Sequence, residues 1–261
     1  MPKQKGFSRR NFLLSGTGAF TAGVALAGGS YIMKSIVKSK ATEVVAVGYW
    51  PYPKGGLDVD LARKYGQEAY YGNGCGYAST YALVRVLKEA LGQGTVWDNL
   101  PVEMMKYGSN GAVGWGTLCG ALNGALAIIT LACPGWNLVG NELMGWYTVT
   151  PLPTDIWNPP IQTVSSSPLC HVSVSVWSKA SGHAVNSPEK MDRASMIVGD
   201  TVAKAAELLN EYAQTGTIEP SFEIPIEYAN CLSCHNVFKN QVGKMNCVLC
   251  HEGHHNNFPK T

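Results

Sequence analysis

Two short cysteine–histidine motifs near the end of the 261-residue chain are its most chemically specific feature. They read Cys231-Leu-Ser-Cys234-His235 and, sixteen residues later, Cys247-Val-Leu-Cys250-His251. The pattern C-x-x-C-H is the attachment signature of a c-type haem, in which both thiols bond to the haem vinyl groups. The histidine that follows becomes the proximal ligand of the iron. The sequence therefore predicts two covalently bound haems, with His235 and His251 as proximal ligands.

Two haems have four axial positions, and the proximal histidines fill only two of them. The other histidines of the chain are candidates for the distal positions: His171, His183, His254 and His255. His183 lies in Ser181-Gly-His-Ala184, which predicts an exposed loop that is able to reach a haem of a partner. For His171, which follows Cys170 directly, ligation and a structural role are equally supported. Met245 is an alternative ligand, but the surplus of histidines favours bis-histidine ligation and a low potential.

The N-terminal region has the features of an export signal. Ser8-Arg-Arg-Asn-Phe-Leu13 is a twin-arginine pattern, and an apolar stretch rich in glycine and alanine follows it over residues 13–33. A basic start and a weakly apolar core are typical of a cleavable signal peptide, although an uncleaved anchor is the alternative. We expect residues 1–41 to be this signal and the protein to reach the periplasm. No later segment has the length and apolarity of a membrane span.

Removal of the signal changes the charge of the chain. Residues 1–41 hold seven basic residues and no acidic one, whereas the whole chain holds 20 basic and 18 acidic residues. The remainder therefore has 13 basic and 18 acidic residues and a formal charge of −5. An acidic chain without a basic patch is not expected to bind nucleic acid.

Four further cysteines are scattered through the middle of the chain: Cys75, Cys119, Cys133 and Cys170. Two disulfides are one explanation for them in an oxidising compartment. A four-cysteine iron–sulfur cluster is the other, because the twin-arginine route carries folded proteins and suits a cofactor inserted before export. Their spacing matches no ferredoxin pattern. Glycines near three of them allow the backbone to approach a ligand and leave amides free to donate to sulfide.

The pattern of apolar residues predicts a mainly α-helical chain. Helices are expected over residues 58–70, 75–91, 99–107, 117–132 and 187–213, whereas residues 141–148 are ambiguous. Residues 149–170 are rich in proline and serine and predict a loop, and residues 171–177 alternate like a strand. The chain is thus divided into a signal peptide (1–41), a helical iron–sulfur-binding domain (42–216) and a short C-terminal dihaem segment (217–261).

This order of features resembles the split-Soret cytochrome c family. The stretch Leu118-Cys-Gly-Ala-Leu-Asn-Gly-Ala125 is also similar to the Cys-Gly-Ala-x-x-Gly helix of a wider redox family with scattered Gly-Cys motifs. The resemblance extends from Val44 to the end of the chain. It implies a mostly helical homodimer with two closely stacked bis-histidine haems per subunit, in which one axial ligand comes from the partner subunit.

The resemblance also implies an iron–sulfur centre on Cys75, Cys119, Cys133 and Cys170, with a [2Fe–2S] cluster expected ahead of a [4Fe–4S] cluster. We therefore expect a periplasmic electron-transfer protein, whose redox partners the sequence does not name, more than an enzyme. A haem-dependent small-molecule oxidoreductase is the alternative, but it requires an open iron position, which the surplus of histidines disfavours. A non-redox exported protein with a zinc ribbon on the four motif cysteines is the second alternative.

Overall fold

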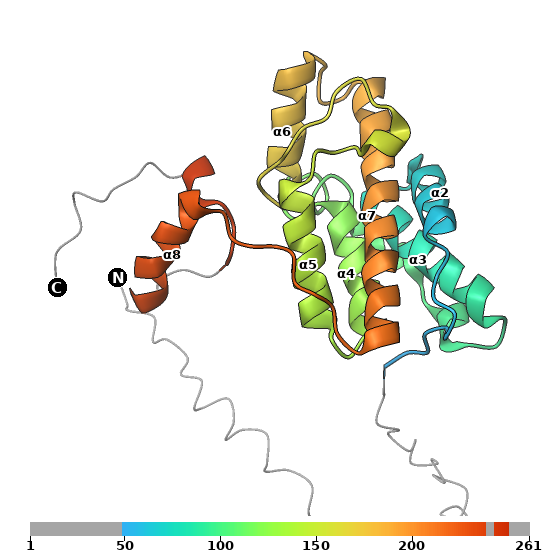
Figure 1. Cartoon of the computed structure of the whole chain (residues 1–261). Coiled ribbons are helices and arrows are strands. Elements are labelled where there is room, and N and C mark those ends of the chain that lie inside the picture. Colours follow the sequence, from blue (N-terminus) through green and yellow to red (C-terminus); the bar gives the residue numbers. More distant parts are fainter. Residues whose placement is uncertain (1–48, 239–242, 251–261) are drawn as a thin grey trace, which may run out of the picture. The chain divides into compact units, whose positions relative to one another are not determined.

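The structure is a computed structural model, and it describes residues 49–238 and 243–250 (Figure 1). The expected signal peptide and the candidate ligands His251, His254 and His255 lie outside the described residues. The regular elements of the described part are all helices, and isolated β-bridges join Leu118 to Leu169 and Leu152 to Thr163. The prediction of a mainly α fold is confirmed. No helix of this part is long and apolar enough to cross a membrane.

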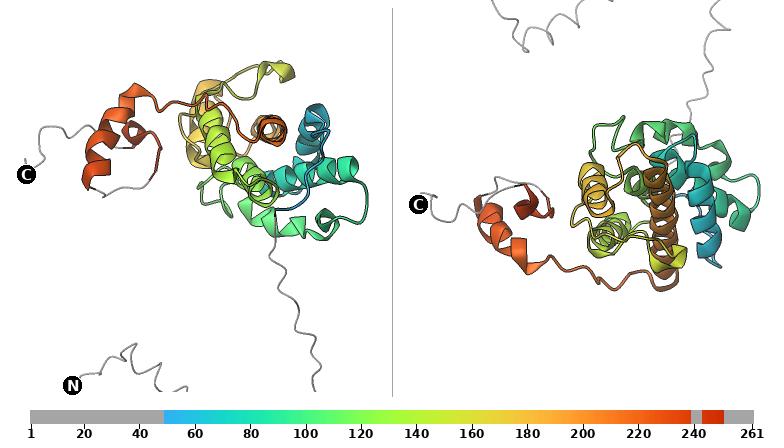
Figure 2. Two further views of the ribbon diagram at one scale, coloured as in Figure 1. Left: turned by 60° about the horizontal axis from the view of Figure 1, so that its bottom comes forward. Right: turned by 90° about the horizontal axis from the view of Figure 1, so that it is seen from above.

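The longest helix, α7, lies among the others. The helices of the body are α2 (Val59–Tyr70), α3 (Cys75–Leu91), α4 (Gly120–Ala132), α5 (Trp136–Val149), α6 (Cys170–Ser181) and α7 (Pro188–Thr215). Short 3₁₀ helices η1 (Val96–Asn99), η2 (Val102–Gly108) and η3 (Asp155–Trp157) lie in the connections, and α8 (Ile226–Phe238) and η4 (Cys247–Leu249) follow a linker. Helix α7 packs against α2, α3, α4 and α5, and Figure 2 shows it end-on between α5 and α2.

The ends of α7 follow from local signals in the sequence. The Ser187 hydroxyl accepts a hydrogen bond from the backbone N–H of Lys190 at 3.3 Å, and Pro188 takes the first helical position. Gly216 ends the helix with a φ of 78°. The face expected to enter the core is buried: Val198, Val202, Ala205 and Leu209. Burial of a valine or leucine side chain contributes about 1.5–3 kcal/mol to folding.

The expectation of a strand over residues 171–177 was wrong, because these residues lie in α6. Valines alternate with polar residues here, which imitates the two-residue period of a strand. The residues that are buried are Ser173 and Trp177, four positions apart, as a helix facing the body requires. Tertiary packing therefore decides the conformation of this segment. The ambiguous residues 141–148 are also helical and belong to α5.

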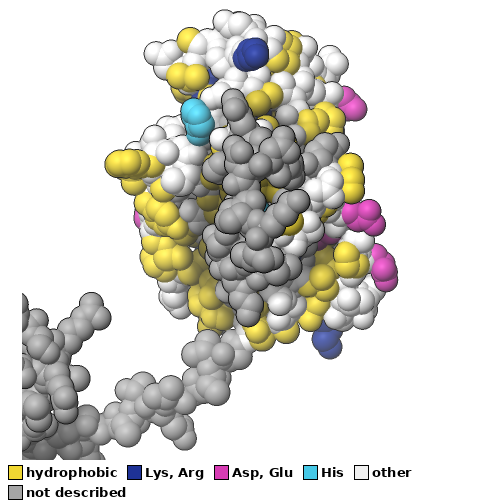
Figure 3. All heavy atoms as spheres, turned by 90° about the vertical axis from the view of Figure 1, so that its left-hand side faces the viewer, with side chains coloured by type: hydrophobic (Ala, Val, Ile, Leu, Met, Phe, Trp, Pro, Cys, Tyr) yellow, Lys and Arg dark blue, Asp and Glu magenta, His cyan; other side chains and the backbone are white. Residues whose placement is uncertain are grey.

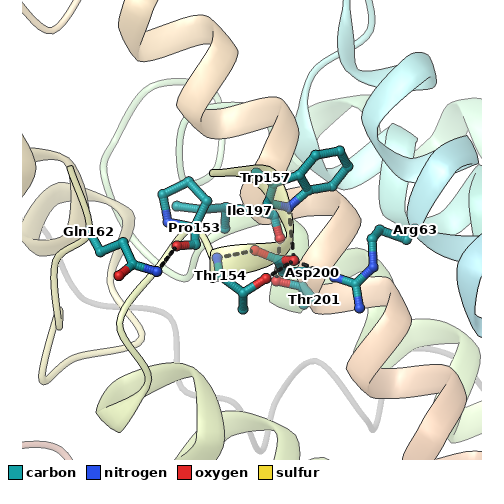
Figure 4. A network of polar contacts seen from close by, with 8 residues as sticks. All are labelled: Arg63, Pro153, Thr154, Trp157, Gln162, Ile197, Asp200 and Thr201. Atoms are coloured by element: carbon teal, nitrogen blue, oxygen red, sulfur yellow. Dashed lines mark hydrogen bonds and ion pairs between the residues drawn. The ribbon is translucent and has the colours of Figure 1, made fainter. Parts of the chain in front are cut away.

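A buried carboxylate joins α2, α7 and the segment before η3 (Figure 4). Asp200 of α7 pairs with the guanidinium of Arg63 of α2. It also accepts hydrogen bonds from the backbone N–H and the hydroxyl of Thr154, both at 2.8 Å, and from Trp157 Nε1 at 2.9 Å. Burial raises the pKa of Asp200, and these donors and Arg63 oppose that rise. The donors therefore compensate for the cost of burying this carboxylate.

A second buried carboxylate attaches the linker to α5. Glu142 accepts hydrogen bonds from the backbone N–H of Ser221 at 3.1 Å and of Phe222 at 3.2 Å, and from the Ser221 hydroxyl. Gly145, one turn further along α5, leaves room for the Phe222 ring, because a Cβ at this glycine would overlap the ring. The chain that leaves α7 is therefore held at the middle of α5 before α8 begins.

We expect Asp200→Asn to lower the free energy of unfolding by about 3–5 kcal/mol, because the change leaves Arg63 as an uncompensated, largely buried charge. Urea unfolding followed by circular dichroism measures the change. Glu207→Gln removes the exposed partner of Lys204 and is the matched control. It should cost less than about 1 kcal/mol. Equal losses in the two variants would show that the Asp200 contacts do not stabilise the fold.

Candidate metal centre

Three of the four scattered cysteines meet at one end of the helical body. Cys75 is the first residue of α3, Cys170 is the first residue of α6, and Cys119 immediately precedes α4. Together with Lys190 and Arg193 of α7, they line a small cavity of about 20 Å³. Each cysteine thus lies at a helix N-terminus, where the positive end of the helix dipole faces a bound anionic centre.

Glycines allow Cys75 and Cys119 to approach each other. A Cβ at Gly120 would lie 2.8 Å from the Cβ of Cys75 and would overlap the carbonyl oxygen of Gly108. A Cβ at Gly124 would overlap the carbonyl oxygen of Gly76. Only glycine permits so close an approach of two backbones. The segment Cys-Gly-Ala-x-x-Gly therefore brings the start of α4 against the start of α3.

A loop over residues 109–117 holds Cys170 beside this pair. The N–H of Cys170 donates to the carbonyl oxygen of Thr117 at 2.8 Å, and the N–H of Cys119 donates to that of Pro168 at 2.9 Å. Asn110 has a φ of 50° and directs its backbone N–H to the sulfur of Cys75. Positive φ is uncommon for residues other than glycine, and such strain is concentrated at functional sites.

Burial controls the protonation of Cys75 and Cys170. It raises the pKa of Cys75 to about 12 and that of Cys170 to about 11, and the nearby Cys119 adds to both shifts. Lys190 lowers both values, and Arg193 lowers that of Cys170. Cys75 and Cys170 are therefore neutral near pH 7 when no metal is bound, and a metal ion that binds them has to displace their protons.

A pair of hydroxyl groups links Cys119 to Arg193. The Tyr147 hydroxyl lies within hydrogen-bonding reach of the Cys119 sulfur and donates to Ser173 Oγ at 3.2 Å. Ser173 Oγ also accepts from Arg193 Nη2 at 3.1 Å. Burial raises the pKa of Tyr147, so the phenol stays neutral and remains a donor.

Four residues around the thiols were not predicted from the sequence: Asn110, Tyr147, Lys190 and Arg193. Only one signal for them was present in the sequence. Lys190 and Arg193 are three positions apart in the predicted helix and share a face with the apolar Ile197, so their side chains point toward the interior.

Cys133 is not brought to the other three cysteines. Cys119 and Cys133 flank opposite ends of α4, which has thirteen residues. A helix of that length spans about 20 Å at 1.5 Å per residue. Cys133 instead lies near Tyr52, and the backbone N–H of Gly135 contacts its sulfur. The expected site on four cysteines is therefore not formed as predicted, because Cys133 lies apart from Cys75, Cys119 and Cys170. All eight cysteines are free thiols, so the alternative of two disulfides is not formed either.

The donor set suits an iron centre. Thiolates are ligands that iron–sulfur clusters use, and the Asn110 amide supplies a hydrogen bond to one of them. Lys190 and Arg193 line the same cavity and lower the pKa of the Cys170 thiol, so positive charge faces the thiols. Within the described residues, no three His, Cys, Asp or Glu side chains already stand in metal-binding geometry. Cys75, Cys119 and Cys170 therefore have to rotate within the cavity to share a metal.

The first haem motif lies on α8 and the second begins at η4. Cys231 and His235 are half-buried and Cys234 is exposed. The Cys247 thiol contacts Cys231, and its pKa is raised by burial and then by that neighbour. The first cysteines of the two motifs are therefore adjacent. Haem attachment at these positions stays a prediction.

His171 and His183 lie outside the cysteine cavity. His171 is exposed and packs beside Gly116. His183 stacks on Trp177 with ring centroids 5.9 Å apart, and its Nδ1 lies 3.6 Å from Glu189 Oε2. The His183 side chain is 46% exposed, so it is open to a group that approaches from outside, in agreement with the predicted loop. Distal ligation by either histidine stays a prediction.

Comparison with known proteins connects this site to a redox family. Residues 77–208, about half of the chain, match the family model described as "Putative redox-active protein (C_GCAxxG_C_C)". The chain belongs to this family. The matched range contains Cys119, Cys133 and Cys170 and begins two residues after Cys75.

The chain is also similar to a cytochrome. It is 34% identical over 160 residues to the split-Soret cytochrome c of Desulfovibrio desulfuricans, and the alignment spans 56% of each chain. The match thus covers little more than half the length of that relative. A solved structure described as a novel iron centre in the split-Soret cytochrome c from the same species has a TM-score of 0.69 and 29% identity, covering 79% of this chain and 91% of its own. The expected resemblance to split-Soret cytochrome c is confirmed.

We expect Gly124→Ala to destabilise the protein by about 1–3 kcal/mol, because its methyl group would overlap the Gly76 carbonyl and force α3 and α4 apart. Thermal unfolding measures the loss. Gly140→Ala is the matched control, because it also adds a methyl group inside a helix but meets only the end of the Leu126 side chain. If both variants unfold at the same temperature, the glycine contact does not limit the packing of these helices.

Proposed function

We propose that this chain is an electron-transfer protein that carries two covalently bound haems and an iron centre on Cys75, Cys119 and Cys170. The convergence of these three thiols in one buried cavity, in a member of a redox-active family, carries the proposal. The two C-x-x-C-H motifs and the similarity to a cytochrome c support the haems. The related solved structure is described as containing an iron centre, and this supports the metal.

The iron centre supplies a one-electron carrier when it is bound. Cys75, Cys119 and Cys170 hold it, the Asn110 amide donates to Cys75, and Tyr147 lies within reach of Cys119. We favour a [2Fe–2S] cluster over a [4Fe–4S] cluster, because the smaller cluster requires less displacement of the side chains around this cavity. Three cysteines leave one ligand position for another group, and Cys133 is too far along α4 to fill it.

The haems are proposed to be six-coordinate, with His235 and His251 as proximal ligands. Distal ligands are then drawn from His171, His183, His254 and His255. The His183 side chain is exposed, and we propose that it ligates a haem of a second subunit in a homodimer. With every axial position filled, the haems exchange electrons without binding a substrate. Electron transfer is therefore favoured over catalysis.

Surface composition supports association with a second protein molecule. In Figure 3, groups of apolar side chains lie on both sides of the grey atoms, with only a few charged groups among them. Large exposed apolar residues of the described part include Val113, Trp115, Trp136 and Val149. Extended apolar surface is typical of interfaces. We propose a homodimer that the twin-arginine route exports to the periplasm, where other redox proteins exchange electrons with it.

The cysteine assignment is tested by counting iron and acid-labile sulfide after anaerobic purification. Cys75→Ser, Cys119→Ser and Cys170→Ser should each remove most of the iron that exceeds the haem iron, because each change removes a ligand. Cys133→Ser is the matched control and should keep that iron, since Cys133 lies at the other end of α4. Loss of this iron in Cys133→Ser alone would overturn the three-cysteine assignment.

The haem assignment is tested with His183→Ala. The variant should keep covalently bound haem, seen as a haem-stained band on a denaturing gel, but part of the haem should become high-spin because a distal ligand is lost. His171→Ala is the comparison, and a high-spin signal confined to it would move the assignment there. The contact between Cys231 and Cys247 also fits a zinc site on the motif cysteines. An unstained wild-type band that contains zinc would favour that alternative.

A further inference from the structure

Two buried cations of α7 face the three thiols without a carboxylate beside them. Lys190 is 8% exposed and Arg193 is 6% exposed. Within the part of the chain that the structure describes, neither forms an ion pair with an acidic side chain. Arg63, the other guanidinium held by α7, is neutralised by Asp200 (Figure 4). The positive charge near the cysteines is therefore uncompensated by protein carboxylates.

The hydrogen-bond acceptors of these cations are neutral, and one donor has no acceptor. Lys190 Nζ donates to Asn110 Oδ1 at 2.9 Å. Arg193 Nη2 donates to Ser173 Oγ at 3.1 Å and to Thr163 Oγ1 at 3.3 Å. Arg193 Nε is buried and has no acceptor. Arg193 also lies over the Trp177 ring, 5.5 Å from its centroid. A buried cation without an opposite charge is costly, so both side chains are suited to a site that holds an anion.

The thiols provide that anion once they bind a metal. Cys75, Cys119, Cys170, Lys190 and Arg193 line the same cavity. Three thiolates carry three negative charges. Protonated lysine and arginine have no lone pair to offer a metal, so they act on the centre only through its charge.

We propose that Lys190 and Arg193 are the counter-charges of the iron centre and raise the potential at which it accepts an electron. This inference rests on the iron centre proposed above. In the reduction, one electron from an external reductant converts one Fe(III) to Fe(II), no bond forms or breaks, and the site becomes more negative by one charge. Two cations fixed in a site of low dielectric stabilise that added charge.

Redox titration of the iron-loaded protein tests the inference. Lys190→Met and Arg193→Met remove one charge each, whereas Lys190→Arg and Arg193→Lys keep it. Lys179→Met removes the same charge from an exposed position of α6 and is the control for net charge. The electron paramagnetic resonance signal of the centre reports its redox state. Thermal unfolding of iron-free and iron-loaded protein gives a second measurement that does not depend on electron transfer.

At a fixed applied potential, Lys190→Met and Arg193→Met should each lower the ratio of reduced to oxidised centre at least tenfold. For a one-electron couple, this corresponds to a reduction potential that is lower by at least 59 mV. In the charge-keeping variants and in Lys179→Met, this ratio should stay within threefold of the wild-type ratio. Iron should also raise the unfolding temperature less in the methionine variants, because their iron-free form no longer contains the uncompensated charge.

Other outcomes also decide the question. Loss of the iron from a methionine variant whose iron-free fold is intact, with recovery in the charge-keeping variant, would support the role of charge. Methionine variants whose ratio of reduced to oxidised centre stays within threefold of the wild-type ratio would overturn the role of charge. A charge-keeping variant that shifts as far as its methionine counterpart would overturn it too. Wild-type protein with no iron beyond its haem iron would instead refute the iron centre, before any variants are compared.

Discussion

The backbones of α3 and α4 meet at Gly76, Gly120 and Gly124, and the candidate metal centre depends on that contact. Because Cys75 begins α3 and Cys119 precedes α4, the packing of two helices places two thiols side by side. The third thiol belongs to Cys170 at the start of α6, and the loop over residues 109–117 holds it beside the other two. Ligands assembled by helix packing need no fixed spacing in the sequence, which explains why the cysteines match no ferredoxin pattern.

Helix α7 supports the fold and the site with different electrostatic arrangements. In its middle, Asp200 has an opposite charge and three hydrogen-bond donors, so it is fully compensated. In its first turns, Lys190 and Arg193 have neutral partners and one nitrogen without any. The first arrangement pairs opposite charges within the protein and is an element of stability. The second leaves two cations without a carboxylate beside the thiols, at the end of the helix where a bound group is expected.

Much of the fold could be predicted from the sequence, because α2, α3 and α7 have clear apolar periods and recognisable helix ends. The strand expected over residues 171–177 failed because only packing revealed that Ser173 and Trp177 are the buried positions. The separation of Cys133 was predictable in principle, since the helix expected over residues 117–132 already placed Cys119 and Cys133 near its two ends. The roles of Lys190, Arg193 and Tyr147 were not predictable, because they depend on contacts between segments that are distant in the sequence.

The hydrogen bonds of Glu142 to Ser221 and Phe222 have a consequence for the haem segment. Without them, the whole stretch between α7 and α8 would act as a free tether. With them, only residues 223–225 separate the anchor from α8, and three extended residues reach about 10 Å. A shorter tether raises the effective concentration of the haem motifs near α5. Under the proposed function, a carboxylate that ligates nothing thereby increases how often the haem segment meets the helical body of its own chain, compared with a free tether of residues 216–225.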